Sequence, residues 1–513
     1  MHMPKGFFLA ALLGAMAGSA FAADHGTASV KVTWSNVTRV SDTVPTTQML
    51  NHKYSLRDSP IHDPFWAALK DLKTEDTRLQ LWFSITNTAV PELKEPTATE
   101  TFWNFTYMDQ LMADFYANTS GRHHINMGTI PRWMFDVPTL ELPTEAGASF
   151  YKYTEGTKGS LLKDPTGKQF ANYQARIYQW YTRGGFTDEL GKFHKSGHHY
   201  KIEFWDVCNE PDFENAITVE QYTKIYDAVT EAIHKIDPNV QFFAPEVSGS
   251  EVPWAKYFLD MKNHKPGTIP IQWFTYHNYV EAKNDPSTWQ EKFFTAPSSG
   301  PTDGVSVNSL AERTKEVLKI RDELSPKAKI AIDELGTFLN VKEGEEACRA
   351  DEPYSAYPAL YWNAEGSNWA ANFIMAQNAG MPIFSMSQMI GYPTQCPSIS
   401  MFDKDTARPN AHYWALHLIS HNFGPGDKLV ATQAGSSDLY AQASVTKAGR
   451  KILLVNSSNQ PLTVDLSSTF SSGSLHAQIV DEKSGEQAPR QETLTGTQIE
   501  LAPFAITVVS QGK

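Results

Sequence analysis

The sequence predicts an α/β protein with a (β/α)8 TIM barrel and a C-terminal all-β sandwich domain. Between residues 41 and 423, short apolar runs alternate eight times with longer helical patterns. Such apolar runs are typical of parallel strands that are buried on both faces. From residue 424 to residue 513, the pattern changes to short strands separated by Gly, Ser and Asn turns, which indicates a sandwich.

Each predicted strand of the barrel is followed by a predicted helix. The strand candidates are residues 44–50, 78–85, 124–130, 202–208, 240–246, 271–279, 329–335 and 382–389. The helix candidates are residues 62–73, 104–117, 169–183, 218–236, 252–263, 306–324, 364–379 and 410–421. Thr218 and Gln221 have the spacing of a helix cap, and Pro238 follows the end of that helix.

The C-terminal part predicts short strands over residues 428–433, 438–446, 451–458, 462–468, 476–482 and 505–511. The turn Gly424-Pro425-Gly426 marks the boundary with the barrel. The segment SVKVTW, residues 29–34, can add a strand to the same sandwich, in which case residues 25–40 belong to this domain.

Residues 1–22 resemble a cleavable signal peptide. An apolar run ends in Ala20-Phe21-Ala22, so we expect the mature protein to begin at Ala23 and to be secreted or periplasmic. The alternative is a membrane anchor. The run is too short and too rich in small residues for that, and no later stretch is apolar enough for a membrane span.

The formal net charge of −13 argues against a nucleic-acid partner, which would need clustered Lys and Arg. The chain has three cysteines. Cys208 lies in a predicted strand and reads as a buried thiol. Cys348 and Cys396 lie in loop-like segments and can pair in an exported protein.

Two of the predicted strands deliver a glutamate at their carboxyl ends. Glu210 ends the fourth strand and Glu334 the seventh, so the two lie across the mouth of the barrel, where such proteins place catalytic groups. Hydrolysis of a glycosidic bond needs two carboxyl groups, one to protonate the leaving oxygen and one to attack or to activate water. Asn209 adds an amide that can hydrogen-bond a substrate hydroxyl.

Four further residues at the predicted rim are candidates for substrate binding. Trp133 follows the third strand and is a candidate platform for stacking on a sugar ring, with a packed rim side chain as the alternative. Gln388 lies at the end of the eighth strand. His277 and Tyr279 share one face of the sixth strand, because side chains alternate along a strand.

No metal site or cofactor is expected. His194, His198 and His199 lie among Lys, Ser and Gly, so they read as solvated loop histidines. The sequence also lacks a P-loop, a dinucleotide-binding glycine fingerprint and a G-x-S-x-G elbow.

The motif Trp205-x-Val207-x-Asn209-Glu210-Pro211 resembles the acid/base motif of clan A retaining glycosidases, and the chain is most similar to glycoside hydrolase family 39. The resemblance extends over residues 128–135, 180–191, 196–207, 276–279 and 389–403. It implies a retaining mechanism with Glu210 as acid/base and Glu334 as nucleophile. It also implies that His277 and Tyr279 line the sugar site, with Tyr279 able to hydrogen-bond the nucleophile.

Several residues differ from the family pattern, among them Asp206, Cys208 and the residues around Glu334, so the sugar stays open. The sequence also leaves the linkage and the oligomeric state open. Long loops over residues 136–168, 280–305 and 340–362 favour a pocket and an exo mode of attack. Two alternatives are a sugar-binding protein that keeps the barrel without the chemistry, and a metal-dependent esterase acting on cell-wall material. The presence of both glutamates favours the hydrolase.

Overall fold

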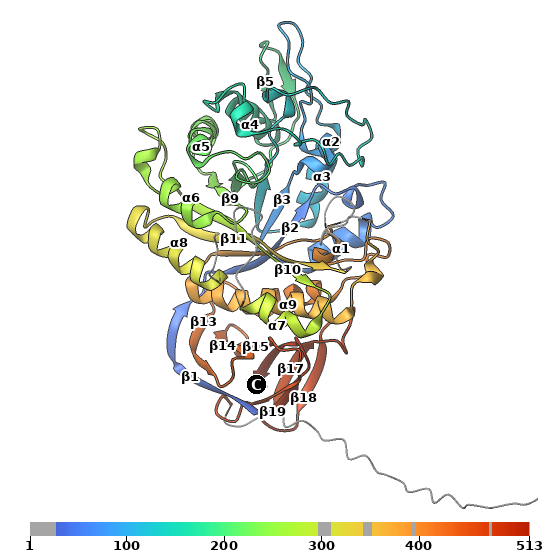
Figure 1. Cartoon of the computed structure of the whole chain (residues 1–513), viewed down its shortest axis with the longest axis vertical. Helices are drawn as coiled ribbons and strands as arrows, with labels where there is room; N and C mark the ends of the chain where they lie inside the picture. Colours follow the sequence, from blue (N-terminus) through green and yellow to red (C-terminus); the bar gives the residue numbers. More distant parts are fainter. Residues whose placement is uncertain (1–26, 296–308, 342–350, 392–395, 471–473, 512–513) are drawn as a thin grey trace, which may run out of the picture.

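The computed structural model describes residues 27–295, 309–341, 351–391, 396–470 and 474–511. The expected signal peptide and its cleavage site lie outside these residues, as does Cys348. Figure 1 shows two parts along the long axis, with a mixed helix and strand unit above and a β-domain below. Within the described residues, every helix is too short or too polar to cross a membrane.

The upper part is the predicted barrel. Its strands are β2 (Val44–Leu50), β3 (Asp76–Gln80), β4 (Arg122–Asn126), β7 (Phe204–Asp206), β8 (Gln241–Phe243), β9 (Pro245–Val247), β10 (Trp273–Lys283), β11 (Lys329–Asn340) and β12 (Ile383–Met386). They pair in the order β8-β7-β4-β3-β2-β12-β11-β10-β9. β8 and β9 flank Ala244 and are two halves of the fifth strand. Ala244 O accepts a hydrogen bond of 2.8 Å from Thr275 N of β10, so the sheet closes on itself.

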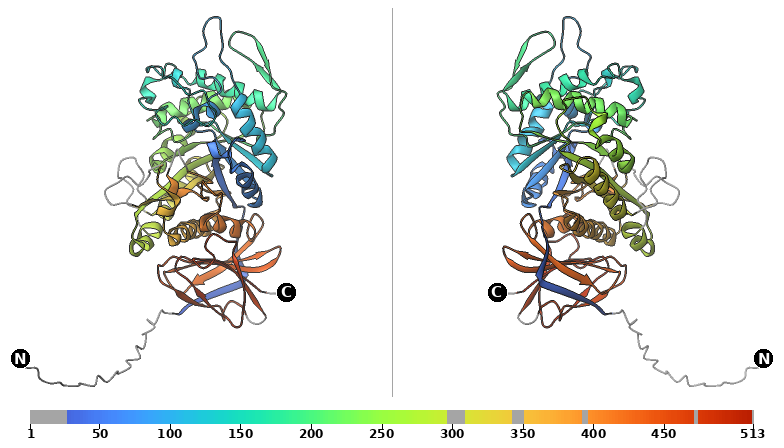
Figure 2. Two further views of the ribbon diagram at one scale, coloured as in Figure 1. Left: turned by 90° about the vertical axis from the view of Figure 1, so that its right-hand side faces the viewer. Right: turned by 90° about the vertical axis from the view of Figure 1, so that its left-hand side faces the viewer.

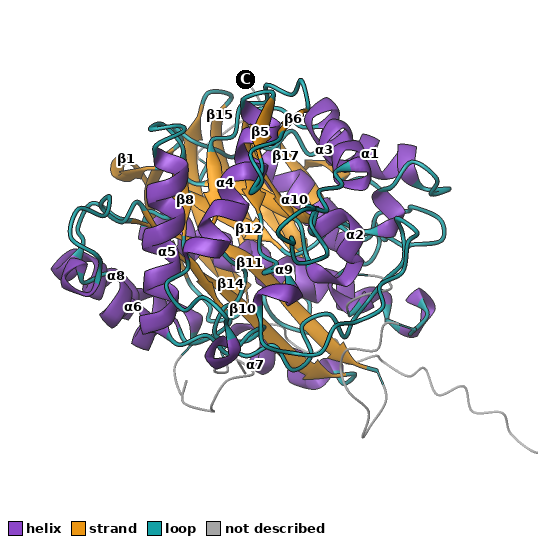
Figure 3. Cartoon of the chain, turned by 90° about the horizontal axis from the view of Figure 1, so that it is seen from above, coloured by secondary structure: helices purple, strands orange, loops and turns teal. Residues whose placement is uncertain are grey.

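Helices follow the strands and lie outside them (Figure 3). They are α1 (His62–Asp71), α2 (Thr86–Ala89), α3 (Thr106–Asn118), α4 (Lys168–Thr182), α5 (Val219–His234), α6 (Glu251–Phe258), α7 (Pro286–Phe294), α8 (Leu310–Leu324), α9 (Ala359–Ala379) and α10 (Ala411–Ser420). The side chain of Thr218 accepts a hydrogen bond from Gln221 N and caps α5, as its sequence predicts.

Helix α7 lies within residues 280–305, for which the sequence predicts a long loop. Asp285 accepts a hydrogen bond from Ser287 N, and Pro286 occupies the first turn, which together start the helix. Trp289 and Phe293 are buried on its inner face. A second unpredicted feature is the hairpin of β5 (Gly185–Thr187) and β6 (Phe193–Lys195), which lies at the end opposite the β-domain (Figures 1 and 2).

The β-domain contains β1 (Thr27–Val40), β13 (Lys428–Ala434), β14 (Leu439–Thr446), β15 (Gly449–Asn456), β16 (Leu462–Asp465), β17 (Leu475–Val480), β18 (Arg490–Leu494), β19 (Gln498–Leu501) and β20 (Ile506–Gln511). The pairing is antiparallel except between β1 and β16. β1 pairs with β13 along most of its length and with β16 at its start, so it connects the two halves of the sheet. Val30, Ile452 and Ile479 are among the residues of a separate apolar core.

The chain enters and leaves the barrel side by side. Ser41 N donates a hydrogen bond of 2.8 Å to Asp427 O, and Gly426 N donates one of 2.7 Å to Ser41 O. The β-domain therefore attaches at the seam between the first and last barrel strands, β2 and β12, which pair with each other. Figure 2 shows the β-domain below the barrel, against its outer helices.

Candidate active site

Glu210 and Glu334 come together inside the barrel. Glu210 lies on the turn after β7, whereas Glu334 lies within β11. One oxygen of each carboxylate and a ring nitrogen of His277 all lie within 4.8 Å of one another. The side chain of Glu210 is 12% exposed and that of Glu334 is 4% exposed, so solvent reaches Glu210 more readily.

The turn that carries Glu210 is held in a left-handed conformation, with a φ of 37°. Its backbone N–H donates a hydrogen bond of 3.1 Å to Glu246 O on β9. Its carbonyl accepts hydrogen bonds from Phe213 N at 3.0 Å and from Glu214 N at 2.8 Å. Left-handed backbone is costly for a non-glycine residue, and such positions concentrate at functional sites. These bonds therefore fix the direction in which the Glu210 carboxylate points.

His277 on β10 lies between the two carboxylates. Its Nδ1 is 2.7 Å from Glu210 Oε1 and 3.5 Å from Glu334 Oε2. Its Nε2 is 3.6 Å from Asp333 Oδ1. Burial alone would lower the pKa of His277, but the charges of Glu334 and Asp333 and the hydrogen bond to Glu210 raise this pKa to about 9. The ring is therefore an imidazolium at neutral pH, with both nitrogens able to donate.

Glu334 receives two further hydrogen bonds. Arg78 Nη1 donates to its Oε1 at 2.7 Å, and Tyr279 Oη donates to its Oε2 at 2.5 Å. Burial raises the pKa of Glu334, but the charges of His277 and Arg78 and the bond from Tyr279 outweigh burial and lower this pKa below its ordinary value. Glu334 is thus held as a carboxylate.

Arg78 on β3 is a site residue that sequence reasoning missed. Its guanidinium is buried and donates from Nε to Asp206 at 3.0 Å and from Nη2 to Glu246 at 2.9 Å, besides the bond to Glu334. Its Nη1 also donates to Gln48 of β2. The signals were present in the sequence, because Arg78 is a charged residue in an apolar run and Glu246 ends the fifth strand as Glu210 ends the fourth.

Asp333 does not point away from Glu334, as simple alternation along a strand would require. Tyr276 pairs with Ile332, but the next residue of β10, His277, pairs with Glu334, so Asp333 is an extra residue in β11. Such a bulge disturbs the alternation of side chains. Asp333 and Glu334 therefore both face His277, and Asp333 Oδ2 also lies 3.9 Å from Arg78 Nε.

Asn209 is buried next to the carboxylates. Its Oδ1 accepts from Arg78 Nη2 at 3.1 Å, and its Nδ2 donates to Glu214 Oε1 at 2.8 Å. Glu214 also accepts from Trp82 Nε1 at 2.7 Å. Burial, followed by the charge of Glu210, raises the pKa of Glu214 well above its ordinary value. The Asn209 amide is therefore fixed in orientation by hydrogen bonds on both sides, from Arg78 and to Glu214.

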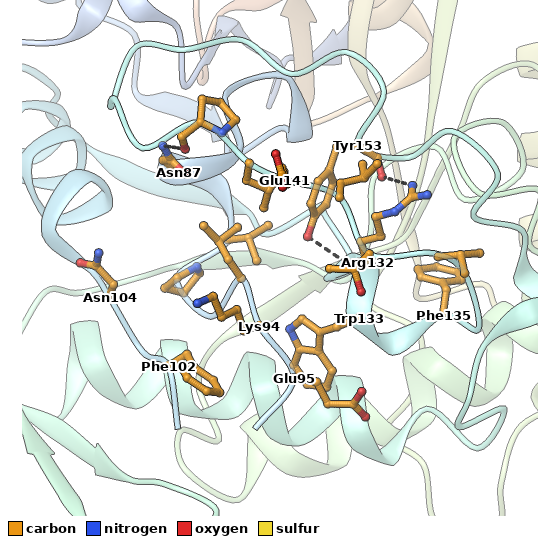
Figure 4. A pocket seen from close by; sticks show the side chains of 18 of the residues that line it. Asn87, Lys94, Glu95, Phe102, Asn104, Arg132, Trp133, Phe135, Glu141 and Tyr153 are labelled. Atoms are coloured by element: carbon orange, nitrogen blue, oxygen red, sulfur yellow. Dashed lines mark hydrogen bonds between the residues drawn. The ribbon is translucent and has the colours of Figure 1, made fainter. Parts of the chain in front are cut away.

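Trp133 lies in a different place from the carboxylates. It lines a cavity of about 1120 Å³ between the loops that follow β3 and β4 (Figure 4). Neither Glu210 nor Glu334 lines this cavity. Its aromatic lining consists of Phe102, Trp103, Tyr107, Trp133, Phe135 and Tyr153. Trp133 is half-buried and donates from Nε1 to Glu92 O at 2.7 Å, which holds the indole in place.

The remaining predicted residues fall outside the carboxylate cluster. Gln388 is fully buried beyond the end of β12, and its backbone N donates to Ile399 O at 3.2 Å. His194 Nε2 lies 2.7 Å from Asp188 Oδ2 in the β5–β6 hairpin. Cys208 is a free, buried thiol, and burial raises its pKa. Cys396 is disulfide-bonded, whereas Cys348, its expected partner, lies outside the described residues.

Sequence comparisons match this chain to glycosidases. The model of glycosyl hydrolases family 39 matches residues 187–298, which include the Glu210 turn and His277. A β-xylosidase of Geobacillus stearothermophilus is 21% identical over 189 residues, which are 37% of this chain and 33% of that relative. The chain therefore aligns with only about a third of that relative's length. The C-terminal immunoglobulin-like domain of D-apionate lactonase matches residues 436–509.

Solved structures share the fold of the whole chain. A glucosidase from Croceicoccus marinus has a TM-score of 0.59 at 13% identity, covering 94% of this chain and 98% of its own. The α-L-arabinofuranosidase of Thermotoga maritima in complex with arabinose has a TM-score of 0.59 at 15% identity, covering 94% and 99%. A family 30 endoxylanase from Clostridium papyrosolvens has a TM-score of 0.52 at 12% identity, covering 95% and 100%. At these identities the likeness shows the fold alone.

Proposed function

We propose that this chain, whose residues 187–298 match the model of glycosyl hydrolases family 39, hydrolyses a glycosidic bond by double displacement with retention. The observation that carries the proposal is the pair of carboxylates, Glu210 and Glu334, that lie with His277 within 4.8 Å of one another. In retaining enzymes the two carboxyl groups are about 5 to 5.5 Å apart, whereas in inverting enzymes about 6.5 to 9.5 Å separate them to admit a water molecule.

The two carboxylates have different surroundings, which support different roles. Glu334 is deeply buried, accepts bonds from Arg78 and Tyr279, and has a lowered pKa, so it is ionised and suited to attack the anomeric carbon. Glu210 is the more exposed of the two and lies on a turn. A leaving group and, later, a water molecule can reach it there.

The reaction then has two steps. Glu334 Oε forms a bond to the anomeric carbon while the bond to the leaving oxygen breaks and Glu210 gives its proton to that oxygen. In the second step Glu210 takes a proton from water, whose oxygen displaces Glu334 and regenerates both groups. His277 holds the Glu210 carboxyl through Nδ1 during both steps.

The substrate we propose is an oligosaccharide or polysaccharide of plant or microbial origin, attacked at a chain end by an exported enzyme. The length of the loops over residues 136–168, 280–305 and 340–362 supports an exo mode, because long loops on the catalytic side favour a pocket. Phe213, on the turn of Glu210, is 51% exposed and is an aromatic surface for the leaving group. The cavity around Trp133 can hold further sugar units (Figure 4).

A screen of aryl glycosides tests this function. The purified mature protein would be incubated with β-xyloside, α-L-arabinofuranoside, β-L-arabinopyranoside, α-L-iduronide, β-galactoside and β-glucuronide, followed by polysaccharides. Turnover by the wild type and its loss in Glu334→Gln supports the hydrolase. Saturable sugar binding without turnover favours the alternative, a carbohydrate-binding protein on a glycosidase scaffold. Loss of activity on chelation would favour a metal-dependent esterase.

A further inference from the structure

Two histidines and an aspartate cluster on the surface of the barrel, away from the carboxylates. Asp71 is the last residue of α1, His417 lies in the last turn of α10, and His421 follows that helix directly. One ligand-forming atom of each lies within 4.8 Å of the other two. His417 is half-buried, whereas Asp71 and His421 are exposed, so an ion in solution can reach all three.

A backbone hydrogen bond fixes the tautomer of His421 that a metal ligand needs. Its Nδ1 donates a hydrogen bond of 2.9 Å to the backbone carbonyl of His417. Metal-binding histidines commonly use one ring nitrogen in this way, which fixes the tautomer and leaves the lone pair on the other nitrogen. The two imidazole rings stack with centroids 3.9 Å apart, as expected for residues four apart at a helix end.

The distance between the other two groups also suits a small cation. His417 Nε2 lies 3.1 Å from Asp71 Oδ2. Two ligands bound to Zn²⁺ at tetrahedral angles are about 3.3 Å apart. An ion could therefore replace the proton between these two atoms with little movement of either side chain. The exposed Lys73 lies near enough to act electrostatically on His417, and its charge opposes cation binding.

The helices that carry these ligands are fixed to each other. Tyr413 Oη of α10 donates to Ala68 O of α1 at 3.0 Å, and Ser420 Oγ donates to Leu72 O at 2.8 Å. α1 and α10 are the first and last long helices of the barrel (Figure 3). A site on these rigid elements spans the seam where the barrel closes.

We propose that Asp71, His417 and His421 bind one divalent transition-metal ion, with Zn²⁺ as the reference ion and water completing the coordination. Two imidazoles and a carboxylate favour Zn²⁺, Ni²⁺, Co²⁺ or Cu²⁺ over Mg²⁺ or Ca²⁺. The ion fastens α1 to α10 and stabilises the folded barrel. This site is independent of the glycosidase chemistry, because none of its residues touches Glu210 or Glu334 in the described contacts.

The test is titration calorimetry with ZnCl₂ on chelator-treated, tag-free protein. The wild type should bind one equivalent at this site, and Asp71→Asn and His421→Gln should each weaken that binding at least about tenfold. His199→Gln is the matched control, since His199 is an exposed histidine elsewhere, and it should bind as the wild type does. Zn²⁺ should also raise the Tm of the wild type but not that of Asp71→Asn.

The absence of saturable binding to the wild type would overturn the proposal. So would binding that survives either substitution undiminished, because the ion would then lie elsewhere, for example at Glu210 and His277. The Tm of Asp71→Asn, measured without metal, shows whether the variant is folded, so that a loss of binding is not mistaken for a loss of structure. Asp71→Asn removes only a surface contact, so its Tm should stay within about 2 °C of the wild type.

Discussion

Arg78 and Glu334 form a hydrogen-bonded ion pair inside the barrel, with 2.7 Å between Nη1 and Oε1. The side chains are 1% and 4% exposed, so water contributes little to solvating either charge. A buried carboxylate stays ionised only when paired in this way. The pair explains how a glutamate in the interior of a barrel can serve as a nucleophile.

Tyr279→Phe should lower kcat/KM by about a hundredfold, because it removes a hydrogen bond to the reacting carboxylate. The same bond helps to lower the pKa of Glu334, so its loss raises that pKa. The acidic limb of the pH profile should therefore move to higher pH. Tyr276→Phe on the same strand is the control, because Tyr276 Oη bonds Thr314 instead, and it should leave the profile unchanged.

His277 should make folding stability depend on pH in the alkaline range. Its pKa is about 9 in the folded protein and about 6.5 in an unfolded chain, so its contribution is complete below pH 6.5 and is lost as the pH rises through 9. The difference corresponds to about 3 kcal/mol. The free energy of unfolding, measured with urea between pH 6 and pH 10, gives this contribution.

The variant His277→Gln separates this contribution from that of His124, whose pKa is also about 9 and whose partner is Asp206. The wild type should lose more stability than the variant between pH 6.5 and pH 9. Parallel stability curves for the two proteins would show that His277 is not protonated in the folded state.

Phe213→Ala should raise KM for aryl glycosides several-fold and change kcat little. The reason is that Phe213 is 51% exposed on the turn that carries Glu210, where we propose that it contacts the leaving group. Phe193, which is 61% exposed on the β5–β6 hairpin, offers the matched control, and Phe193→Ala should behave as the wild type. An unchanged KM in Phe213→Ala would remove this residue from the leaving-group side.

Trp133→Ala should act on long substrates only. The indole lines the cavity of Figure 4, which neither glutamate lines, so an aryl monoglycoside should not reach it. We expect KM for an oligosaccharide to rise about tenfold or more, as one lost stacking contact implies. Equal effects on the oligosaccharide and on the monoglycoside would mean that Trp133 acts through the fold. Trp34→Ala in the β-domain serves as the comparison.

Much of the fold follows from sequence pattern, because buried parallel strands are apolar runs and every predicted run of the barrel contains a strand. The end of a strand differs from the prediction where the apolar pattern of the sequence continues beyond the last residue that pairs. The run over residues 78–85 is apolar to its end, but β3 stops at Gln80 and the chain turns into a 3-10 helix at Phe83–Ile85. β18 was missed because most of its residues are polar and exposed, which leaves no alternation to read.

The meeting of Glu210 and Glu334 could be predicted, because each of them ends an apolar run in the sequence. The side chains that surround the two glutamates could not be predicted in this way. Arg78 stands out in the sequence as a charged residue in an apolar run, but its partners Asp206, Glu246 and Glu334 lie far apart in sequence and meet only when the strands assemble. The position of Asp333 depends on a bulge in β11, and register is set by pairing, not by local pattern.

The most direct test of the mechanism is to trap the glycosyl-enzyme intermediate. The protein would react with a 2-deoxy-2-fluoro glycoside, carrying an activated leaving group, of the sugar that the wild type turns over. Peptide mass spectrometry would then locate the label. We expect one equivalent of glycosyl group on Glu334. A label on another residue, or a first product of inverted configuration without any label, would contradict the assignment of Glu334 as the nucleophile.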